Sequence, residues 1–260
     1  MLAAERQVRI LEEVKRRGGV RVRELAELLR VSDMTIRRDL DALAGQGRLD
    51  KVHGGATVKR SPSTEEPGFE AKQHRQTEEK EAIAAAAAEM VRPGAAIGLS
   101  AGTTTWTLAR HLGGIADLTV VTNSVRIADT LHTMDSLAPS VILTGGVRTP
   151  SDALVGPVAV ASMRLLHLDL VFVGVHGMDL GAGLTTPNLL EADTNRALVA
   201  AGKRLVVLAD HTKWATVGIS TMAYLDQVDV VVTDDGLPVE AQEELRTRVG
   251  QLVVVPTGHA

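Results

Sequence analysis

Several residue types are absent from this 260-residue chain or scarce in it, and each shortage excludes a class of site. There is no cysteine, so the chain has no disulfide, no thiolate nucleophile and no cysteine-based zinc site. Aromatic residues make up only 2% of the chain, so its core must consist of Val, Leu, Ile and Ala. The eight histidines show no metal-ligand spacing. We therefore expect neither a metal ion nor another cofactor.

Long apolar runs are missing as well. No run approaches the ~20 residues that a membrane-spanning helix needs, and residues 1–10 lack the apolar region and cleavage motif of a signal peptide. The hydrophobic content of 45% and the charged content of 23% are ordinary for a globular protein. We expect a cytoplasmic protein that does not bind a membrane and is long enough for two domains.

The whole chain lacks a large excess of either charge, since its net charge is only −4. The charges are nevertheless unevenly distributed along the sequence. Residues 1–60 contain 14 lysines and arginines against nine acidic residues, a net +5, whereas residues 61–260 contain 14 against 23, a net −9. A basic head and an acidic body predict two domains with different partners. A phosphate backbone would attract the head and repel the body.

The head is organised around residues 31–40, VSDMTIRRDL, which are typical of a short capped helix. Ser32 can accept a hydrogen bond from the backbone N–H of Thr35. Helical periodicity buries one apolar face and leaves Met34 and Arg38 on the opposite face, with Thr35 and Arg37 on the flanks. A short helix with an apolar back and arginines near its N-terminal end fits a major groove.

The rest of the head supplies a frame for this helix. Apolar spacing predicts helices over residues 4–17 (with Val8, Ile10, Leu11 and Val14 inward) and over residues 23–29 (with Leu25, Leu28 and Leu29 inward). Two extended pieces, residues 48–52 and 56–58, surround glycines and indicate a hairpin. We interpret residues 1–58 as a winged helix-turn-helix domain with its motif at about residues 20–39. The alternative is a small helical domain without a nucleic-acid partner.

The order of the charged side chains favours DNA over that alternative. An arginine fork suits guanine O6 and N7, while cationic side chains on the wing, including Arg48, would meet phosphates or the minor groove. The predicted DNA-binding residues are Arg21, Arg23, Ser32, Met34, Thr35, Arg37, Arg38, Lys51 and His53.

Residues 59–75 are rich in Pro, Ser and Glu and are predicted to be a linker. In residues 76–260, apolar strands alternate with helices, which predicts a mostly parallel, Rossmann-like α/β domain with helices on both faces of the sheet. We expect strands over residues 95–99, 118–122, 140–143, 168–174, 204–209, 228–233 and 252–255, and helices over residues 77–91, 124–132, 156–166, 189–201 and 238–249.

Ligands of such sheets bind outside the carboxyl ends of the strands. Residues 100–105, SAGTTT, lie between a strand and a helix, where free N–H groups and hydroxyls make an anion site. The loop lacks the Walker lysine and the GxGxxG pattern, so a nucleotide is not indicated. The alternative is an ordinary capped helix start.

Five further polar loops follow or trail strand ends and could converge with this one. Hydroxyls, glycines, a lysine and carboxylates suit a phosphorylated sugar or sugar alcohol, although each loop alone is compatible with turn chemistry. The predicted effector-binding residues are Ser100, Gly102, Thr103, Thr104, Thr105, Asn123, Gly145, Gly146, His176, Asp179, Glu191, Asp210 and Lys213.

The stretch RELAELLRVSDMTIRRDLDALAGQGRLDKVHGGA resembles the N-terminal domain of DeoR-type bacterial transcriptional regulators. SAGTTTWTLARHL, VVTNS, LTGG, DLVFVGVHGMD, GLTTPNLLEAD and VVLADHTKW resemble their sensor domain. The resemblance spans nearly the whole chain. It implies a repressor of a metabolic operon that binds double-stranded operator DNA as a homo-oligomer, a dimer or tetramer, and is released by a phosphorylated sugar.

That sensor domain is similar in fold to ribose-5-phosphate isomerase, and the resemblance assigns roles to individual residues. Residues 102–105 match the isomerase phosphate loop. Asp179 falls in its acidic loop, Glu191 at its general base, and Asp210 with Lys213 in its D-x-S-K turn.

The chain departs from the isomerase pattern at two places. Residues 176–178, His-Gly-Met, replace most of its Gly-Ala-Asp-Glu, and residues 181–186 contain no lysine where the isomerase has one. The resemblance therefore implies a pocket that binds without catalysis, with no catalytic residue. Ser100 also stands where regulators of this family often have aspartate, which bears on the identity of the effector.

Two alternatives stay open at this point. One is a sugar-phosphate isomerase with a DNA-binding appendage, and the other is a DNA-bound activator whose body senses nothing. The patterns do not decide between repression and activation, and they identify neither the sugar nor the operator.

Overall fold

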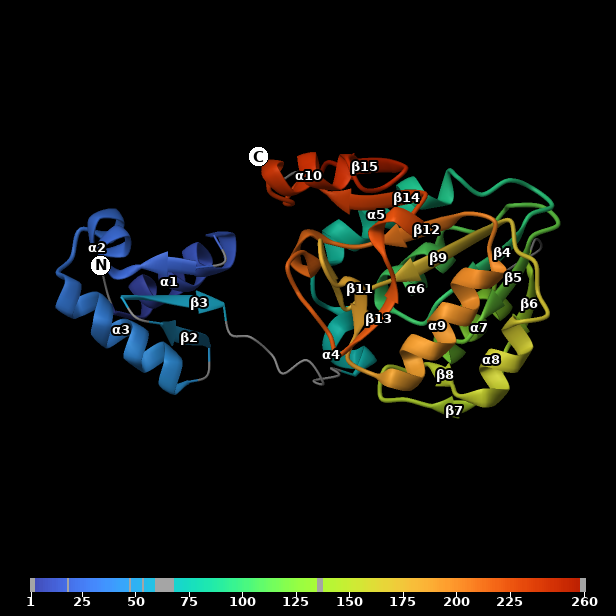
Figure 1. The fold of residues 1–260 in the computed structure, drawn as a ribbon, viewed down its shortest axis with the longest axis horizontal. Helices are drawn as coiled ribbons and strands as arrows, with labels where there is room; N and C mark the ends of the chain where they lie inside the picture. Colours follow the sequence, from blue (N-terminus) through green and yellow to red (C-terminus); the bar gives the residue numbers. More distant parts are fainter. Residues whose placement is uncertain are drawn as a thin grey trace. The chain divides into compact units, whose positions relative to one another are not determined.

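The computed structural model describes residues 3–17, 19–46, 48–52, 54–58, 68–134 and 138–257. The chain divides into two compact units, Met1–Pro62 and Ser63–Ala260 (Figure 1). Within the described residues, no helix is both long and apolar enough to cross a membrane.

The first unit is a winged helix-turn-helix, as the sequence predicts. Helices α2 and α3 form the helix-turn-helix, and the wing hairpin β2–β3 pairs with β1 in an antiparallel sheet of order β1-β3-β2. Its elements are α1 (Ala3–Arg17), β1 (Gly19–Arg21), α2 (Val22–Leu29), α3 (Asp33–Gly45), β2 (Leu49–Val52) and β3 (Gly55–Val58).

Two of the predicted core positions of this unit are wrong. Val8 is 55% exposed and Leu28 is 54% exposed. Helix α2 begins at Val22, so its buried stripe continues through Leu25, Ala26 and Leu29, and Leu28 falls outside it. Val8 lies on the opposite side of α1 from Ile10, which is fully buried. The other core residues include Val14, Ile36, Leu40, Leu43 and Leu49.

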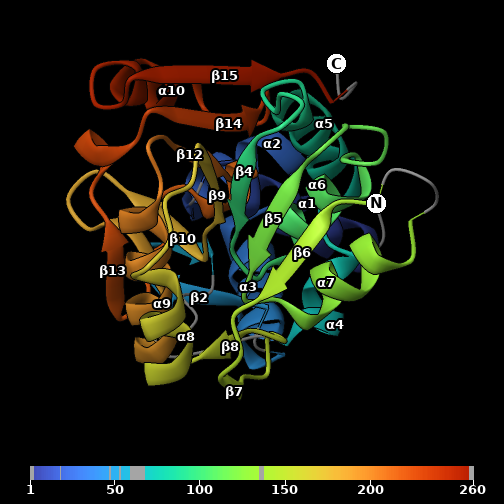
Figure 2. The ribbon, with the colours of Figure 1, turned by 90° about the vertical axis from the view of Figure 1, so that its right-hand side faces the viewer.

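The second unit contains a seven-stranded parallel sheet of order β15-β14-β12-β9-β4-β5-β6 (Figure 2). Its strands are β4 (Ala96–Leu99), β5 (Thr119–Thr122), β6 (Ser140–Leu143), β9 (Leu170–Gly174), β12 (Leu205–Leu208), β14 (Val230–Asp234) and β15 (Gln251–Val255). All seven predicted strands are present, with ends shifted by a few residues.

Helices cover both faces of this sheet because its strands are apolar on both sides. Val206 and Leu208 pack in one cluster with residues of α5 (Thr77–Ala88), α6 (Thr103–Arg110) and α7 (Val125–His132). Val207, which points the other way, packs with residues of α8 (Pro157–Met163), α9 (Leu189–Ala201) and α10 (Val239–Arg246). The predicted Rossmann-like α/β arrangement is therefore confirmed.

Several elements of this unit are absent from the sequence prediction. A small antiparallel sheet combines β10 (Gly177–Asp179), β11 (Gly183–Thr186) and β13 (Ser220–Ala223), and a hairpin joins β7 (Val147–Arg148) to β8 (Leu154–Val155). Short 3-10 helices occur at η1 (His211–Lys213) and η2 (Leu225–Gln227).

The C-terminal part of the predicted linker is also structured. Residues 59–67 lie outside the described residues, but α4 (Phe69–Gln73) is a helix of the second unit. Phe69 is buried, and its ring meets the Trp106 ring edge-on, with centroids 5.7 Å apart and planes at 84°. This aromatic contact attaches α4 to α6.

Candidate functional site

The recognition helix α3 begins as the sequence predicts. Ser32 is its N-cap, and its Oγ accepts a hydrogen bond from the backbone N–H of Thr35 at 3.3 Å. The Ser32 and Thr35 hydroxyls also lie 2.9 Å apart. This cap fixes the start of α3, so the side chains of its first turns leave the helix in a defined direction.

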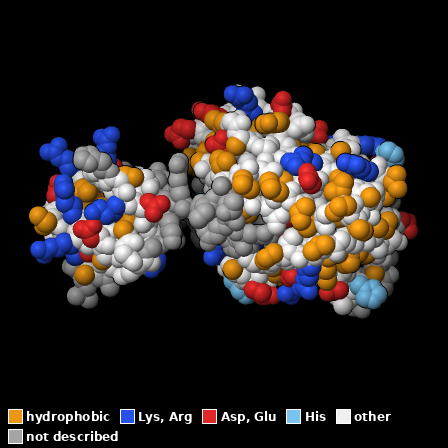
Figure 3. Space-filling model, turned by 60° about the horizontal axis from the view of Figure 1, so that its bottom comes forward, with side chains coloured by type: hydrophobic (Ala, Val, Ile, Leu, Met, Phe, Trp, Pro, Cys, Tyr) orange, Lys and Arg blue, Asp and Glu red, His pale blue; other side chains and the backbone are white. Residues whose placement is uncertain are grey.

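The exposed face of α3 carries the two arginines. Met34, Arg37 and Arg38 are exposed, and neither arginine has a hydrogen-bond or ion-pair partner within the described residues. Arg21 and Arg23, at the start of α2, are exposed too. Lys and Arg side chains gather on the surface of this unit (Figure 3). Cationic forks without a protein partner are free to bind phosphates or base edges.

Of the two residues predicted to bind DNA from the wing, Lys51 already has a partner within the protein. Lys51 forms an ion pair with Asp41 of α3, and both side chains are exposed. An exposed pair of this kind contributes at most about 1 kcal/mol, so Lys51 can exchange Asp41 for a phosphate. His53 lies outside the described residues.

Asp39 positions α3, a role that the sequence reading missed. This carboxylate is buried and accepts hydrogen bonds from Arg6 Nε at 2.5 Å, from Arg6 Nη2 at 3.2 Å and from Gln7 Nε2 at 3.2 Å. The hydrogen bond to Asp39 raises the pKa of Arg6 above its ordinary value. Asp39 shares the inward face of α3 with Ile36, Leu40 and Leu43, and that spacing was the available signal.

In the second unit, two predicted effector residues join the strand ends to one another. Ser100, at the end of β4, is buried, and its Oγ accepts a hydrogen bond from Gly174 N–H of β9 at 3.1 Å. Asn123, at the end of β5, accepts from Ala101 N–H at 2.8 Å and donates to the Leu154 carbonyl at 3.1 Å. Both side chains therefore link neighbouring strand ends and loops to one another.

The phosphate-loop threonines divide into two groups. The Thr105 hydroxyl is buried and donates to the carbonyls of Ser100 at 2.7 Å and Gly102 at 3.1 Å, which holds the loop in shape. Thr103 and Thr104 stand in the first turn of α6, and their hydroxyls make no hydrogen bond within the part of the chain that the structure describes. The first N–H groups of a helix have no intrahelical acceptor. Free N–H groups and hydroxyls at a helix start are groups that an anion can bind.

Glu191 is fixed by hydroxyl groups. Asn188 caps α9 and accepts from the Glu191 N–H at 3.2 Å. The Glu191 carboxylate accepts hydrogen bonds from the hydroxyls of Thr149 at 2.9 Å, Thr186 at 3.2 Å and Ser151. A ligand hydroxyl that donated to Glu191 would compete with these three donor hydroxyls for the carboxylate.

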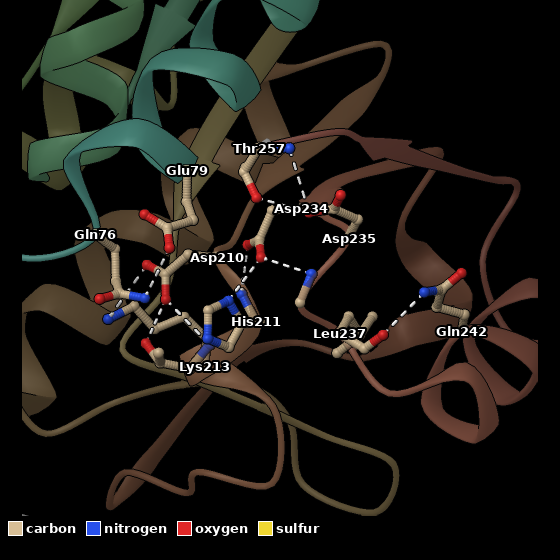
Figure 4. Close-up of polar contacts among 12 residues, drawn as sticks. Gln76, Glu79, Asp210, His211, Lys213, Asp234, Asp235, Leu237, Gln242 and Thr257 are labelled. Carbon is tan, nitrogen blue, oxygen red and sulfur yellow. Dashed lines mark hydrogen bonds and ion pairs between the residues drawn. The ribbon is translucent and has the colours of Figure 1, made fainter. Parts of the chain in front are cut away.

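A charged cluster lies at the end of β12 (Figure 4). Asp210 is 1% exposed, and its Oδ1 accepts from the backbone N–H of Thr212 at 3.1 Å and from the Thr212 hydroxyl. Its Oδ2 is buried without a hydrogen-bond partner among the described residues, and the nearest cation is Lys213 Nζ at 3.7 Å. One Asp210 oxygen is therefore buried with the Lys213 ammonium at ion-pair distance and no hydrogen-bond donor among the described residues.

Lys80 belongs to the same cluster and was missed from the sequence. It is 4% exposed, and its ammonium donates to the carbonyls of Lys72 at 2.6 Å and of Arg75. Burial lowers the pKa of Lys80 to about 8, with Asp210 opposing the shift and Lys213 adding to it. Lys80 lies three residues before Ile83 on the buried face of α5, and this helical spacing could have predicted its burial from the sequence.

His211 and Asp234 form a pair beside Asp210 (Figure 4). Asp234 accepts from the His211 backbone N–H at 2.7 Å and lies 2.6 Å from its Nδ1. The hydrogen bond to Asp234 raises the pKa of His211, against a burial that lowers it. Burial would raise the pKa of Asp234, but its bonds to His211 and Gly236 outweigh this and lower the pKa.

The remaining predicted effector residues have local roles. Asp179 Oδ1 accepts from the N–H groups of Gly181 and Ala182, both at 2.9 Å, and closes the β10–β11 turn. His176 N–H donates to the Thr185 carbonyl at 3.2 Å. Gly145 and Gly146 adopt positive φ angles of 74° and 123°, which suits a tight turn after β6.

Metal chemistry has no support in the described part of the chain, where no group of three or more His, Asp or Glu residues is arranged to hold an ion.

Comparison with known proteins identifies both units. Residues 6–62 match the DeoR-like helix-turn-helix domain and residues 75–235 match the DeoR C terminal sensor domain. The chain is 37% identical over 248 residues to the HTH-type transcriptional regulator GlpR of Haloferax volcanii, covering 95% of this chain and 96% of that one. It is 33% identical over 246 residues to the glycerol-3-phosphate regulon repressor of Escherichia coli K12, covering 94% and 96%.

Among solved structures, ribose 5-phosphate isomerase A of Neisseria gonorrhoeae matches 53% of this chain and 53% of its own, with 18% identity and a TM-score of 0.39. A likeness of that size does not bear on function. The relatives that match over most of their length are named as regulators and repressors rather than as enzymes. The chain belongs to the DeoR family of helix-turn-helix transcriptional regulators, as its sequence motifs indicate.

Proposed function

We propose that this regulator represses a carbohydrate-metabolism operon and leaves its operator when a phosphorylated sugar or sugar alcohol binds the second unit. The observation that carries the proposal is the pair Arg37 and Arg38 on a capped, internally anchored α3, both exposed and without a partner among the described residues. The name of the E. coli relative, a glycerol-3-phosphate regulon repressor, supports repression and the class of effector.

On the DNA side, α3 enters the major groove with Thr35, Arg37 and Arg38 toward the bases. The buried Asp39–Arg6 contact holds the helix from behind, so base contacts do not depend on a mobile element. The recognition helix of one copy reads one half-site, and two half-sites require two copies. The protein therefore acts as a dimer or tetramer.

On the effector side, the phosphate lies at the start of α6, where the free hydroxyls of Thr103 and Thr104 and the first N–H groups bind it. Lys213 supplies positive charge. The sugar hydroxyls take the free oxygen of Asp210 and the carboxylate of Glu191. Ser100, Asn123 and Thr105 keep these loops in register without contacting the ligand.

The mechanism is thermodynamic linkage. An effector that binds one arrangement of the assembled sensor units more tightly shifts the population toward that arrangement and changes the spacing of the two heads. The operator affinity then falls although α3 itself is unchanged.

The DNA proposal is tested with Arg38→Ala and, as a matched control, Arg164→Ala, an exposed arginine of the second unit. Binding to the DNA upstream of the gene is measured by fluorescence anisotropy at several salt concentrations. Loss of a bidentate base contact costs about 1–3 kcal/mol, so Arg38→Ala should weaken specific binding by roughly tenfold to a hundredfold while Arg164→Ala does not. Equal affinity of Arg38→Ala and wild type would refute the assignment.

The effector proposal is tested by thermal unfolding with glycerol 3-phosphate, ribose 5-phosphate, fructose 1-phosphate and inorganic phosphate. A ligand at 100 times its Kd stabilises the native state by about 2.7 kcal/mol and raises Tm. Thr104→Val should abolish the shift without lowering the Tm of the free protein, because the Thr104 hydroxyl makes no hydrogen bond to any residue that the structure describes. A full shift in Thr104→Val would contradict the proposed phosphate site.

A further inference from the structure

Helix α4 is the first described element after residues 59–67, the stretch that follows the DNA-binding unit in the sequence. It packs through Phe69 on Trp106, and the Phe69 N–H donates to the Pro150 carbonyl at 3.3 Å. The sensor end of the linker is therefore attached to residues 148–153, which we call the coupling turn.

Arg126 of α7 joins α4 to the coupling turn a second time. Its Nε donates to Asp152 at 2.8 Å, its Nη2 to Glu70 at 2.5 Å, and its guanidinium lies 5.2 Å from the centre of the Phe69 ring. Arg148 also binds Asp152, at 2.6 Å. Burial alone would raise the pKa of Asp152, but these two arginines outweigh it and lower the pKa.

The other side of the coupling turn binds Glu191. The hydroxyls of Thr149 and Ser151 both donate to Glu191 Oε1. The turn between these contacts is short and closed, because Thr149 N–H donates to the Ala153 carbonyl at 2.8 Å and Asp152 N–H to the Thr149 carbonyl at 3.0 Å. Asp152 has a φ of 61°, a left-handed conformation that a flexible loop would not maintain.

We propose that the coupling turn transmits the state of the Glu191 carboxylate to α4. Side chains on one side of the turn bind Glu191, and groups on the other side hold Phe69 and Arg126. When Thr149 and Ser151 lose the carboxylate, the turn loses the bonds that fix it, and its hold on α4 weakens.

Regulation follows if the proposed function holds, and this part of the inference rests on it. The hydroxyls of Thr149 and Ser151 both donate to Glu191 Oε1, and a carboxylate oxygen has about two lone-pair sites, so the two hydroxyls occupy this oxygen. A sugar hydroxyl that binds Glu191 competes with the two from the coupling turn. Effector binding would thereby loosen the segment that leads to the DNA-binding unit.

The test is amide hydrogen exchange of residues 68–75 in the full chain, which needs neither effector nor operator. Glu191→Ala removes the carboxylate, and the double variant Thr149→Val/Ser151→Ala removes the hydroxyls while keeping Glu191. Both should speed exchange in residues 68–75 about tenfold, the effect of losing roughly one charge-assisted hydrogen bond, because Glu191 holds the coupling turn through Thr149 and Ser151.

A matched pair of arginines tests the other end. Arg126 and Arg110 both lie over an aromatic ring, at 5.2 Å from Phe69 and 5.4 Å from Trp106, but among the contacts of the described residues only that of Arg126 reaches the coupling turn. Arg126→Met should speed exchange in residues 68–75 and Arg110→Met should not. Exchange within about twofold of wild type in Glu191→Ala and in the double variant would overturn the proposal. Because no DNA or sugar enters the assay, a failed operator or effector experiment leaves this result unaffected.

Discussion

Replacing the buried Lys80 by methionine should change how the stability of the protein depends on pH. The ammonium is almost fully buried, and burial lowers its pKa from 10.5 to about 8. Methionine has a similar length and no charge, so Lys80→Met removes the cost of burying an ammonium. It also removes the hydrogen bonds to the carbonyls of Lys72 and Arg75.

The lowered pKa sets the size and direction of the effect. Below pH 8 the ammonium is protonated in the folded and unfolded states, and folding bears the whole cost of burying it, about 3 kcal/mol for a shift from 10.5 to 8. Between pH 8 and 10.5 the folded protein releases this proton first, so the free energy of unfolding rises with pH. Between pH 7 and pH 9.5 the gain is about 2 kcal/mol.

The loss of two carbonyl partners costs about 1–3 kcal/mol at every pH. At pH 7, Lys80→Met should therefore have nearly the same free energy of unfolding as the wild type. At pH 9.5 its free energy of unfolding should fall below that of the wild type by about 2 kcal/mol more than at pH 7. Urea unfolding followed by circular dichroism measures the free energy of unfolding of both proteins at both pH values. The effects of other titrating groups are the same in the two proteins and cancel when the variant is compared with the wild type.

Lys203→Met is the matched control. Lys203 is 73% exposed, so folding does not remove its ammonium from water and its replacement should give the same stability difference at both pH values. If the stability curves of Lys80→Met and wild type run parallel from pH 7 to pH 9.5, the reasoning from burial is refuted.

Two further outcomes follow from close contacts in the structure. Gly55→Ala should destabilise the DNA-binding unit by about 2 kcal/mol or more, because its Cβ would lie 2.2 Å from the Val20 carbonyl oxygen in the sheet; Gly45→Ala, whose Cβ meets nothing within 4 Å, is the control in urea unfolding. Asp234→Asn should be most destabilising between the ordinary pKa values of 3.8 and 6.5, where Asp234 is ionised and His211 protonated. Its effect should shrink as pH rises through the raised pKa of His211 and as pH falls through the lowered pKa of Asp234. An effect of equal size at pH 5.5 and pH 9 would contradict the pairing.

The parts of the fold that could be predicted from sequence are those that local physics determines. The Ser32 cap is a contact between near neighbours, and the strands of the parallel sheet are continuous apolar runs. The wing hairpin is marked by glycines at its turn. In each case the residues that form the element also stabilise it.

The elements that were missed depend on distant partners. Helix α4 has five residues and is attached through Phe69 to Trp106, far away in the sequence. The strands β10, β11 and β13 are short and contain Gly, Thr and Ser, so they lack the apolar alternation of an independent strand. These elements are stabilised by tertiary contacts rather than by the local conformational preference of their residues.

The candidate effector site shows the same limit. Residue type and position at strand ends made Thr103, Glu191 and Asp210 candidates, but could not tell which hydroxyls are used in hydrogen bonds inside the protein. Thr105 has the same residue type as Thr103 and yet is fully used in its own loop. Asp179 has the chemistry of a ligand-binding carboxylate and closes a turn instead.

The scarcity of aromatic residues gives this protein a built-in optical probe. Residues 1–62 contain no Phe, Tyr or Trp, so tryptophan emission comes from the second unit alone. Trp106 touches Phe69 of α4, and Trp214 directly follows Lys213. One indole therefore lies against α4 at the C-terminal end of the linker, and the other lies beside the charged residues of the proposed pocket. The fluorescence of unlabelled protein can report on both places without a contribution from tryptophan in the DNA-binding unit.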